Sequence, residues 1–184
     1  MTTAAVRRES SCARRPAETR ERCLLGRIAT KDRTALLELN SSYRQRLRRF
    51  LTCLTLRADV EDMIIDILFV VWQTAPNYRD DSRICAWIGA IALHRGLLLQ
   101  PPAKSRDADA SGVLECGLQE LPIEQRALYA LTYCLGCSCE EVASIVQCPV
   151  DSVKTEMIRG RPQLQLALFS LGRRGPYPQL ALDI

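Results

Sequence analysis

Hydrophobic residues recur along most of the chain at the three- and four-residue spacing of amphipathic helices. Leucine, isoleucine and phenylalanine follow this spacing over 21–39 and again over 43–56, which predicts two helices. The same spacing predicts a helix over about 59–74, ended by Pro76, and another over 84–99. No paired strands are indicated, so the pattern predicts an all-α fold.

A polar segment divides this helical pattern into two parts. Residues 100–113 contain two consecutive prolines, alternating charges and almost no apolar side chain, which predicts an interdomain linker. The helical spacing then returns, with Pro122 at the predicted start of a helix and Gly136 at its end. We therefore expect two small helical domains joined by a flexible linker. The expected division is a flexible basic arm over 1–20, a first domain over 21–99, the linker over 100–113, a second domain over 114–172 and a tail over 173–184.

The second domain contains the pattern of a helix-turn-helix. Ser138 and Glu141 have the spacing of a capping box, in which each side chain satisfies a free N–H group at a helix start. A three-residue turn over 147–149 separates this short helix from another that begins near Val150. This layout is typical of DNA-reading modules, although the spacing alone also fits an ordinary helical hairpin.

The second helix of this pair has a polar outer face. Its hydroxyl and guanidinium groups can bond to base edges, and its cations can bond to phosphates. Gly160 and Pro162 lie further along and predict that the helix kinks or ends early. The candidate DNA-contacting residues on this face are Ser152, Lys154, Thr155 and Arg159.

The helix predicted over 59–74 carries carboxylates on one side. Asp59, Asp62 and Asp66 share that side, opposite the apolar residues, and the first turns of a helix favour negative charge. Two interpretations stay open: a solvated acidic face, or a docking surface for a basic partner. Ile65 and Val70 border the acidic stripe, which favours an interface.

Charge and cysteine content narrow the function classes. Residues 1–50 hold 13 of the 25 Lys and Arg residues but 5 of the 21 acidic residues, which suits contact with nucleic acid or another acidic surface. The first residues lack the apolar core of a secretory signal, and the longest apolar run, 63–72, is too short to span a bilayer. An odd number of irregularly spaced cysteines argues against a secreted disulfide scaffold. We expect a cytoplasmic protein without membrane insertion.

Cysteines in the second domain raise a further hypothesis, a thiol-based metal or redox sensor. Cys134 and Cys137 have metal-type spacing, and Cys139 and Cys148 follow, but the second C-x-x-C of familiar zinc sites is missing. Free cysteine also packs well in cores, so we predict no metal and no cofactor. His94 is the only histidine, and no Ser- or Cys-based motif points to it, so we predict that the chain is not an enzyme.

Both patterns resemble one family, the extracytoplasmic-function sigma factors. The sequences DVEDMIIDILFVVWQ (59–73) and YRDDSRICAWIGAIALHRG (78–96) resemble the helices of region two, and residues 118–164 resemble region four. The motifs D-x-E-D, W-I-x-x-I-A, L-P-x-E-Q-R and P-V-x-S-V-K follow the family's order, and the resemblance covers 21–172.

This resemblance implies an RNA polymerase sigma factor, with core RNA polymerase and promoter DNA as partners and an anti-sigma factor as a further possible partner. The implied polymerase-docking acids are Asp59, Glu61, Asp62 and Asp66. The implied contacts to the minus-ten promoter element are Tyr78, Asp80, Ser82, Arg83 and Trp87, and residues Ser152, Lys154, Thr155 and Arg159 would read the minus-thirty-five element.

Several positions depart from the family pattern. Ala90 and Leu93 stand where family members carry Arg, and Val70 stands where a basic residue is usual. The DNA-facing side of region two has therefore lost positive charge, on which phosphate contacts depend. Two readings follow: a divergent sigma factor, or a degenerate relative that binds DNA or polymerase without initiating transcription.

Overall fold

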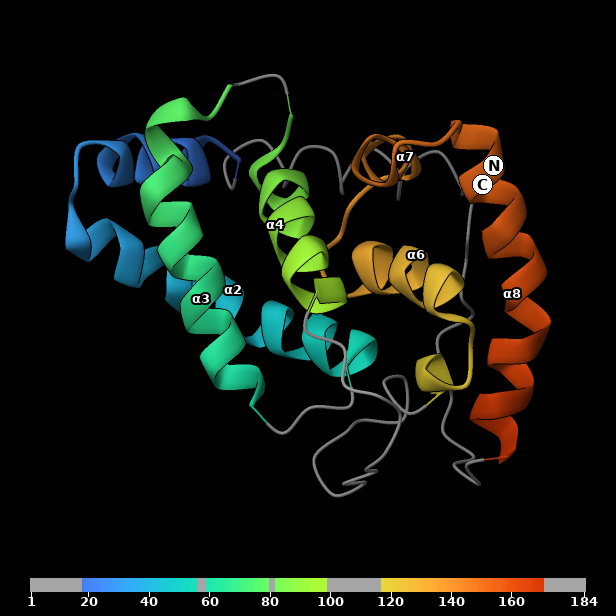
Figure 1. The fold of residues 1–184 in the computed structure, drawn as a ribbon. Coiled ribbons are helices and arrows are strands. Elements are labelled where there is room, and N and C mark those ends of the chain that lie inside the picture. The colour runs from blue at the N-terminus through green and yellow to red at the C-terminus, as the bar shows by residue number, and fades with distance from the viewer. Residues whose placement is uncertain (1–17, 56–58, 80–81, 99–116, 171–184) are drawn as a thin grey trace, which may run out of the picture.

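The computed structural model describes residues 18–55, 59–79, 82–98 and 117–170, and Figure 1 shows that these residues are mostly helical. This confirms the predicted all-α fold. The predicted linker, most of the basic arm and the tail lie outside these residues. No helix in the described part of the chain combines the length and the hydropathy needed to cross a bilayer.

The N-terminal third forms two helices, but the break between them differs from the prediction. One helix covers 18–29, so residues 18–20 are helical and do not belong to an arm. The other, α2, is continuous over Arg33–Leu54, where the sequence pattern predicted a break near residue 40. Lys31 has a φ of 68°, in the left-handed region, and this residue turns the chain between the two helices.

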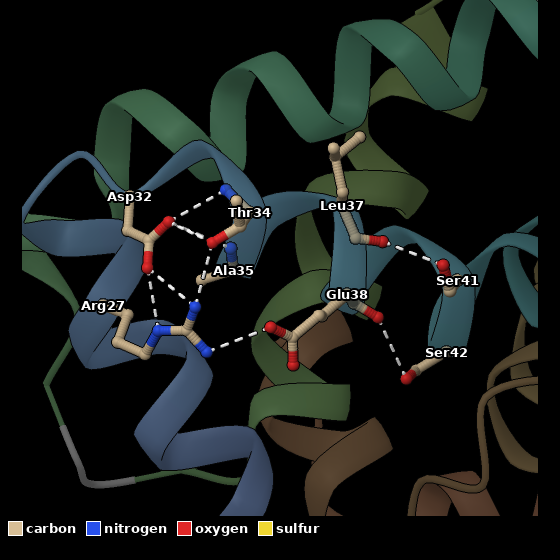
Figure 2. Close-up of polar contacts among 8 residues, drawn as sticks. All are labelled: Arg27, Asp32, Thr34, Ala35, Leu37, Glu38, Ser41 and Ser42. Carbon is tan, nitrogen blue, oxygen red and sulfur yellow. Dashed lines mark hydrogen bonds and ion pairs between the residues drawn. The ribbon is translucent and has the colours of Figure 1, made fainter.

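Polar contacts fix this corner (Figure 2). Asp32 caps α2 by accepting hydrogen bonds from the N–H groups of Thr34 (2.9 Å) and Ala35 (3.4 Å). Arg27 donates from the preceding helix to Asp32 (2.8 Å) and to Glu38 on α2 (3.1 Å). Hydrogen bonds from Thr34 and Arg27 lower the pKa of Asp32 to about 2, so this cap is charged at neutral pH.

The next helices complete the first helical group, which consists of the described residues between 18 and 98. Helix α3 covers Val60–Thr74 and passes into a 3₁₀ turn, η1, over Ala75–Asn77, because Pro76 cannot continue an α-helix. Helix α4 covers Ile84–Leu98, one residue from the predicted end. Helices α2, α3 and α4 all pack against one another.

The second helical group, residues 117–170, contains the helix-turn-helix. A short helical segment at 117–119 precedes α6 (Ile123–Tyr133), which is followed by α7 (Cys139–Val146) and α8 (Val150–Ser170). The capping box of Ser138 and Glu141 is present in both directions, as predicted. Gln147 ends α7 with a φ of 55°, which reverses the chain before α8.

Helix α8 does not end at Gly160 or Pro162, as the sequence had indicated. It continues to Ser170, because Leu164, Ala167 and Leu168 are buried beyond the proline and hold the last turns against the protein. Gly160 serves the packing of α8 on α6. A Cβ atom there would lie 2.9 Å from the Gln125 Oε1 atom and 3.0 Å from a Tyr129 ring carbon.

The two helical groups pack directly against each other. Helix α2 contacts α6, and α4 contacts α7, so α4 stands between α3 and the second group (Figure 1). Gly89 makes the close approach possible: a Cβ atom there would lie 3.2 Å from methyl carbons of both Leu131 and Leu135. Across the same boundary, Gln119 donates to the carbonyl of Thr52 (3.0 Å). Buried residues of both groups therefore form one continuous core.

Candidate functional site

The acidic side of α3 divides into residues used inside the protein and residues that face solvent. Glu61 accepts ion pairs from Arg44 (2.7 Å) and Arg48 (3.2 Å) on α2, so its carboxylate joins two helices of its own group. Asp59 is half-buried at the start of α3, whereas Asp62 and Asp66 are exposed. The predicted set of four acids is thus not one uniform surface.

Large apolar side chains lie beside the two exposed acids. Ile65 is 64% exposed and Phe69 is 58% exposed, and both share one side of α3 with Asp62 and Asp66 because the four are three or four residues apart. We call Asp62, Ile65, Asp66 and Phe69 the α3 face. Sequence reasoning noted Ile65 but missed Phe69, although its spacing of seven residues from Asp62 was a usable signal.

Tyr78, Ser82 and Trp87 lie together beside the start of α4. The Tyr78 hydroxyl donates a hydrogen bond to the carbonyl of Ser82, and the Tyr78 ring packs at 5.1 Å from the Trp87 ring, tilted by 60°. Three of the residues predicted to contact the minus-ten element therefore lie together. Asp80 falls outside the described residues.

The Arg83 side chain lies at the boundary between the two helical groups. Its guanidinium forms ion pairs with Glu18 on the first helix (3.0 Å) and with Glu141 on α7 (3.2 Å). Burial alone would lower the pKa of Arg83, but the nearby Cys85, Glu141 and Glu18 raise it above its ordinary value. A residue predicted to contact DNA is thus engaged with the second group.

The outer side of α8 is arranged as the sequence predicted. Val153 and Met157 are buried, which turns Ser152, Thr155 and Arg159 to solvent, and Lys154 is half-buried beside them. Glu156 accepts hydrogen bonds from Gln125 on α6 (3.1 Å) and from Arg159 (2.9 Å), and these bonds lower the pKa of Glu156. The glutamate therefore stays charged and holds Arg159 beside the exposed hydroxyls.

The cysteines of the second group do not gather into one cluster. Cys134 lies against Cys53 of α2, with 3.9 Å between their sulfur atoms, and Cys137 lies beside Cys85 of α4. Both pairs cross the boundary between the helical groups. Sequence reasoning missed Cys53 and Cys85 because no spacing along the chain links them to the later cysteines.

A helical group followed by a capped helix-turn-helix, with an exposed acidic and apolar face on the first, is the arrangement that the sequence resemblance to sigma factors implied. Comparisons with known proteins agree: residues 111–164 match the family model described as Sigma-70, region 4. The chain is 23% identical to the ECF RNA polymerase sigma-E factor of Escherichia coli K12, covering 84% of this chain and 97% of that protein. It is also 23% identical to the corresponding protein of Haemophilus influenzae, with 79% and 93% covered.

Solved structures show the same fold. CnrH, determined in complex with the cytosolic domain of CnrY, has a TM-score of 0.68 at 20% identity, covering 82% of this chain and 98% of that one. The sigma factor RpoE of Bartonella quintana, in complex with the anti-sigma factor NepR, has a TM-score of 0.55 at 23% identity, covering 74% and 99%. Residues 111–164 thus match sigma region 4, and the chain as a whole is similar to extracytoplasmic-function sigma factors.

Proposed function

We propose that this sigma factor works by docking on core RNA polymerase through the α3 face and by reading promoter DNA through α8. One observation carries this proposal: α3 and α8 lie on opposite sides of the molecule (Figure 1), and each helix is buried along one side and exposed along the other. Because the two surfaces lie on different helices, the chain can contact a polymerase through one and DNA through the other.

The α3 face has the composition of a docking surface. Exposed carboxylates attract a basic partner and orient it, while Ile65 and Phe69 supply apolar area that becomes buried on contact. A merely solvated acidic face would not need two large apolar side chains more than half exposed. Glu61 supports this face indirectly, because its ion pairs fix α3 on α2.

DNA contact is assigned to two places. On α8, Ser152, Thr155 and Arg159 would reach base edges of the minus-thirty-five element, and Lys154 would bond to a phosphate. The geometry of Arg159 supports this role, since Glu156 orients its guanidinium without burying it.

The cluster beside the start of α4 is the second place. Tyr78, Ser82 and Trp87 form one unit there, and Arg83 would join it once released from Glu141. The role of Asp80 stays a prediction from the sequence. Aromatic rings suit this site because unpaired bases of the minus-ten element can stack on them.

The degenerate alternative rests on the surface of α4. Leu97 and Leu98 are 45% and 64% exposed where positive charge would favour DNA. Replacement of Leu93 by Arg does not test this alternative, because Leu93 is buried; Ala90 is half-buried and is the better site. If charge loss has disabled promoter melting, Ala90→Arg should restore it, and an unchanged variant would argue against that cause.

Two further assignments complete the proposal. We assign an anti-sigma factor as a partner class, because the two solved structures described above were determined as complexes, one of them named as containing an anti-sigma factor. Sigma factors are in general not enzymes, and we propose that this chain likewise directs the polymerase and catalyses no reaction itself.

A charge-reversal pair tests the docking assignment. Asp66→Lys on the α3 face and Glu124→Lys on α6 change net charge equally, and both positions are exposed. In equilibrium binding to purified core RNA polymerase, we expect Asp66→Lys to weaken binding about tenfold, or about 1.4 kcal/mol, through repulsion by a basic partner. Glu124→Lys should bind like the unaltered chain. Equal effects of the two variants would reject the α3 face as the docking surface.

A further inference from the structure

At the boundary between the two helical groups, a thiol from each group lies close to the other. Cys85 lies near the start of α4, and Cys137 lies in the segment before α7. Their sulfur atoms and a carboxylate oxygen of Glu141 all lie within 4.8 Å of one another. Residues far apart in sequence are thus within reach of a small side-chain movement.

We propose that Cys85 and Cys137 are an oxidation-sensitive pair, and that a disulfide between them locks the two helical groups of this sigma factor together. The consequence for transcription rests on the function proposed above, whereas the disulfide itself does not. A second pair, Cys53 and Cys134, crosses the same boundary, and the experiment below distinguishes the two.

The surroundings favour Cys85 as the attacking sulfur. The Cys137 S–H group donates to Cys85, and the Arg83 guanidinium lies nearby, and both lower the pKa of the Cys85 thiol against the opposing effect of burial. The same interaction and burial raise the pKa of Cys137. The Cys85 thiol therefore loses its proton more readily than the Cys137 thiol.

Access to the pair is through its polar edge. Both cysteines are buried, at 2% and 3% exposure, but the side chains of Arg83 and Glu141 beside them are 31% and 15% exposed. A small oxidant such as hydrogen peroxide can enter there through modest fluctuations, whereas a bulky reagent cannot. Cys53 and Cys134 are also buried, at 0% and 5% exposure, with 3.9 Å between their sulfur atoms.

The oxidation has two steps. The Cys85 thiolate attacks one peroxide oxygen, an S–O bond forms as the O–O bond breaks, and the released hydroxide takes up a proton to become water. The Cys137 sulfur then attacks the Cys85 sulfenic acid, an S–S bond forms, and the hydroxyl leaves with the Cys137 proton as a second water. The two cysteines together lose two electrons and two protons, and peroxide is reduced to water.

A metal ion fits this place less well. Zinc sites of the structural kind use four ligands, and only three donors gather here among the residues that the structure describes. The Glu141 carboxylate already accepts from the Ser138 N–H group (2.7 Å) and from Arg83 (3.2 Å). A guanidinium at that distance would repel a divalent cation.

Locking the groups together would prevent promoter binding for a geometric reason. The minus-ten and minus-thirty-five elements are about 25 base pairs apart, or about 85 Å at 3.4 Å per base pair. A compact body of this chain's size has a diameter of about 40 Å, so the packed arrangement cannot reach both elements. The chain between Leu98 and Gly117 can bridge at most about 65 Å when extended, which is enough to let the groups separate.

Disulfide mapping on the full chain tests the pair. The reduced protein is treated with hydrogen peroxide, free thiols are blocked, and cross-linked peptides are identified by mass spectrometry. We expect a Cys85–Cys137 link that dithiothreitol removes, and its loss in both Cys85→Ser and Cys137→Ser. Cys148→Ser, in the turn of the same group, is the control and should still form the link. A link confined to Cys53 and Cys134, the absence of any link, or stoichiometric zinc in the reduced protein would each overturn the proposal.

Polymerase binding and transcription then test the consequence. We expect the oxidised protein to lose at least about tenfold in promoter-dependent transcription and to recover with dithiothreitol. The Cys137→Ser variant should keep full activity after the same peroxide treatment. If the link forms but transcription is unaffected, the lock is wrong. If the link forms and the reduced chain never supports transcription, the thiol pair stands and the proposed function fails. If the reduced chain is active and no link forms, the proposed function stands and the thiol pair fails.

Discussion

Replacing Gly89 by leucine should separate the two helical groups without unfolding either. Gly89 lies on α4, and a Cβ atom there would already be 3.2 Å from methyl carbons of Leu131 and Leu135 and 3.7 Å from Ile145. All three neighbours belong to the second group, so the remaining carbons of a leucine side chain have no space in the packed arrangement. Within α4 itself, leucine is the better helix former.

The expected size of the effect follows from this geometry. Overpacking a close contact costs about 1–3 kcal/mol. Because the cost is felt only when the groups are packed, it moves the ratio of open to packed molecules by about 5–150-fold. Gly26→Leu is a matched control, since a Cβ atom at Gly26 on the first helix has nothing within 4 Å.

Thiol alkylation measures the opening directly. Cys53, Cys85, Cys134 and Cys137 are buried at or beside the boundary, so a maleimide reacts with them mainly when the groups separate. Gly89→Leu should raise their alkylation rates by the same 5–150-fold range, while the exposed Cys23 serves as an internal reference. Rates equal to those of the unaltered chain would refute the reasoning, because they would show that the boundary repacks locally around the larger side chain.

Other variants test the separate modules. Arg159→Ala should weaken specific promoter binding by about 1–3 kcal/mol in a gel-shift or anisotropy titration, and a uniform small loss on all sequences would place the guanidinium on phosphate. Ser138→Ala removes half of the capping box and should destabilise the helix-turn-helix by about 1 kcal/mol in denaturant unfolding, whereas Ser138→Asp should be close to neutral. The pKa of Asp32 is lowered on folding, so its contribution to stability is full above its ordinary pKa and is lost as pH falls towards 2. Asp32→Asn should therefore flatten the fall of the melting temperature over that acidic range, and an unchanged pH profile would contradict the assignment.

Local signals predicted much of this fold. Helix α3 begins next to an acidic first turn and ends at a proline, and α7 is preceded by a capping box, so their bounds could be read from neighbouring residues. The outward direction of Ser152, Thr155 and Arg159 was equally predictable, because burial of Val153 and Met157 fixes the rotation of the helix.

The errors arose where tertiary contacts outweighed local preference. The chain turns at Lys31 because Asp32 caps the next helix and Arg27 holds the corner, while the pattern near residue 40 continues as helix. Pro162 does not end α8, because the buried side chains after it compensate for one missing hydrogen bond.

The boundary between the groups could not be predicted from the sequence at all. Its contacts join Cys53 to Cys134 and Arg83 to Glu141, and no periodicity relates residues that far apart. Glu61 was predicted as a docking acid but is paired with two arginines of α2, which only the packing of the helices reveals.

Transcription from a pool of genomic fragments tests the central claim most directly. Purified core RNA polymerase is combined with the reduced chain, and transcript 5′ ends are sequenced, with an active sigma factor from the same host confirming that the polymerase is competent. We predict start sites that depend on the added chain and share sequence elements about 10 and 35 base pairs upstream, with Arg159→Ala depleting transcripts that need the distal element. No chain-dependent start site on any fragment, with a competent polymerase, would contradict the account.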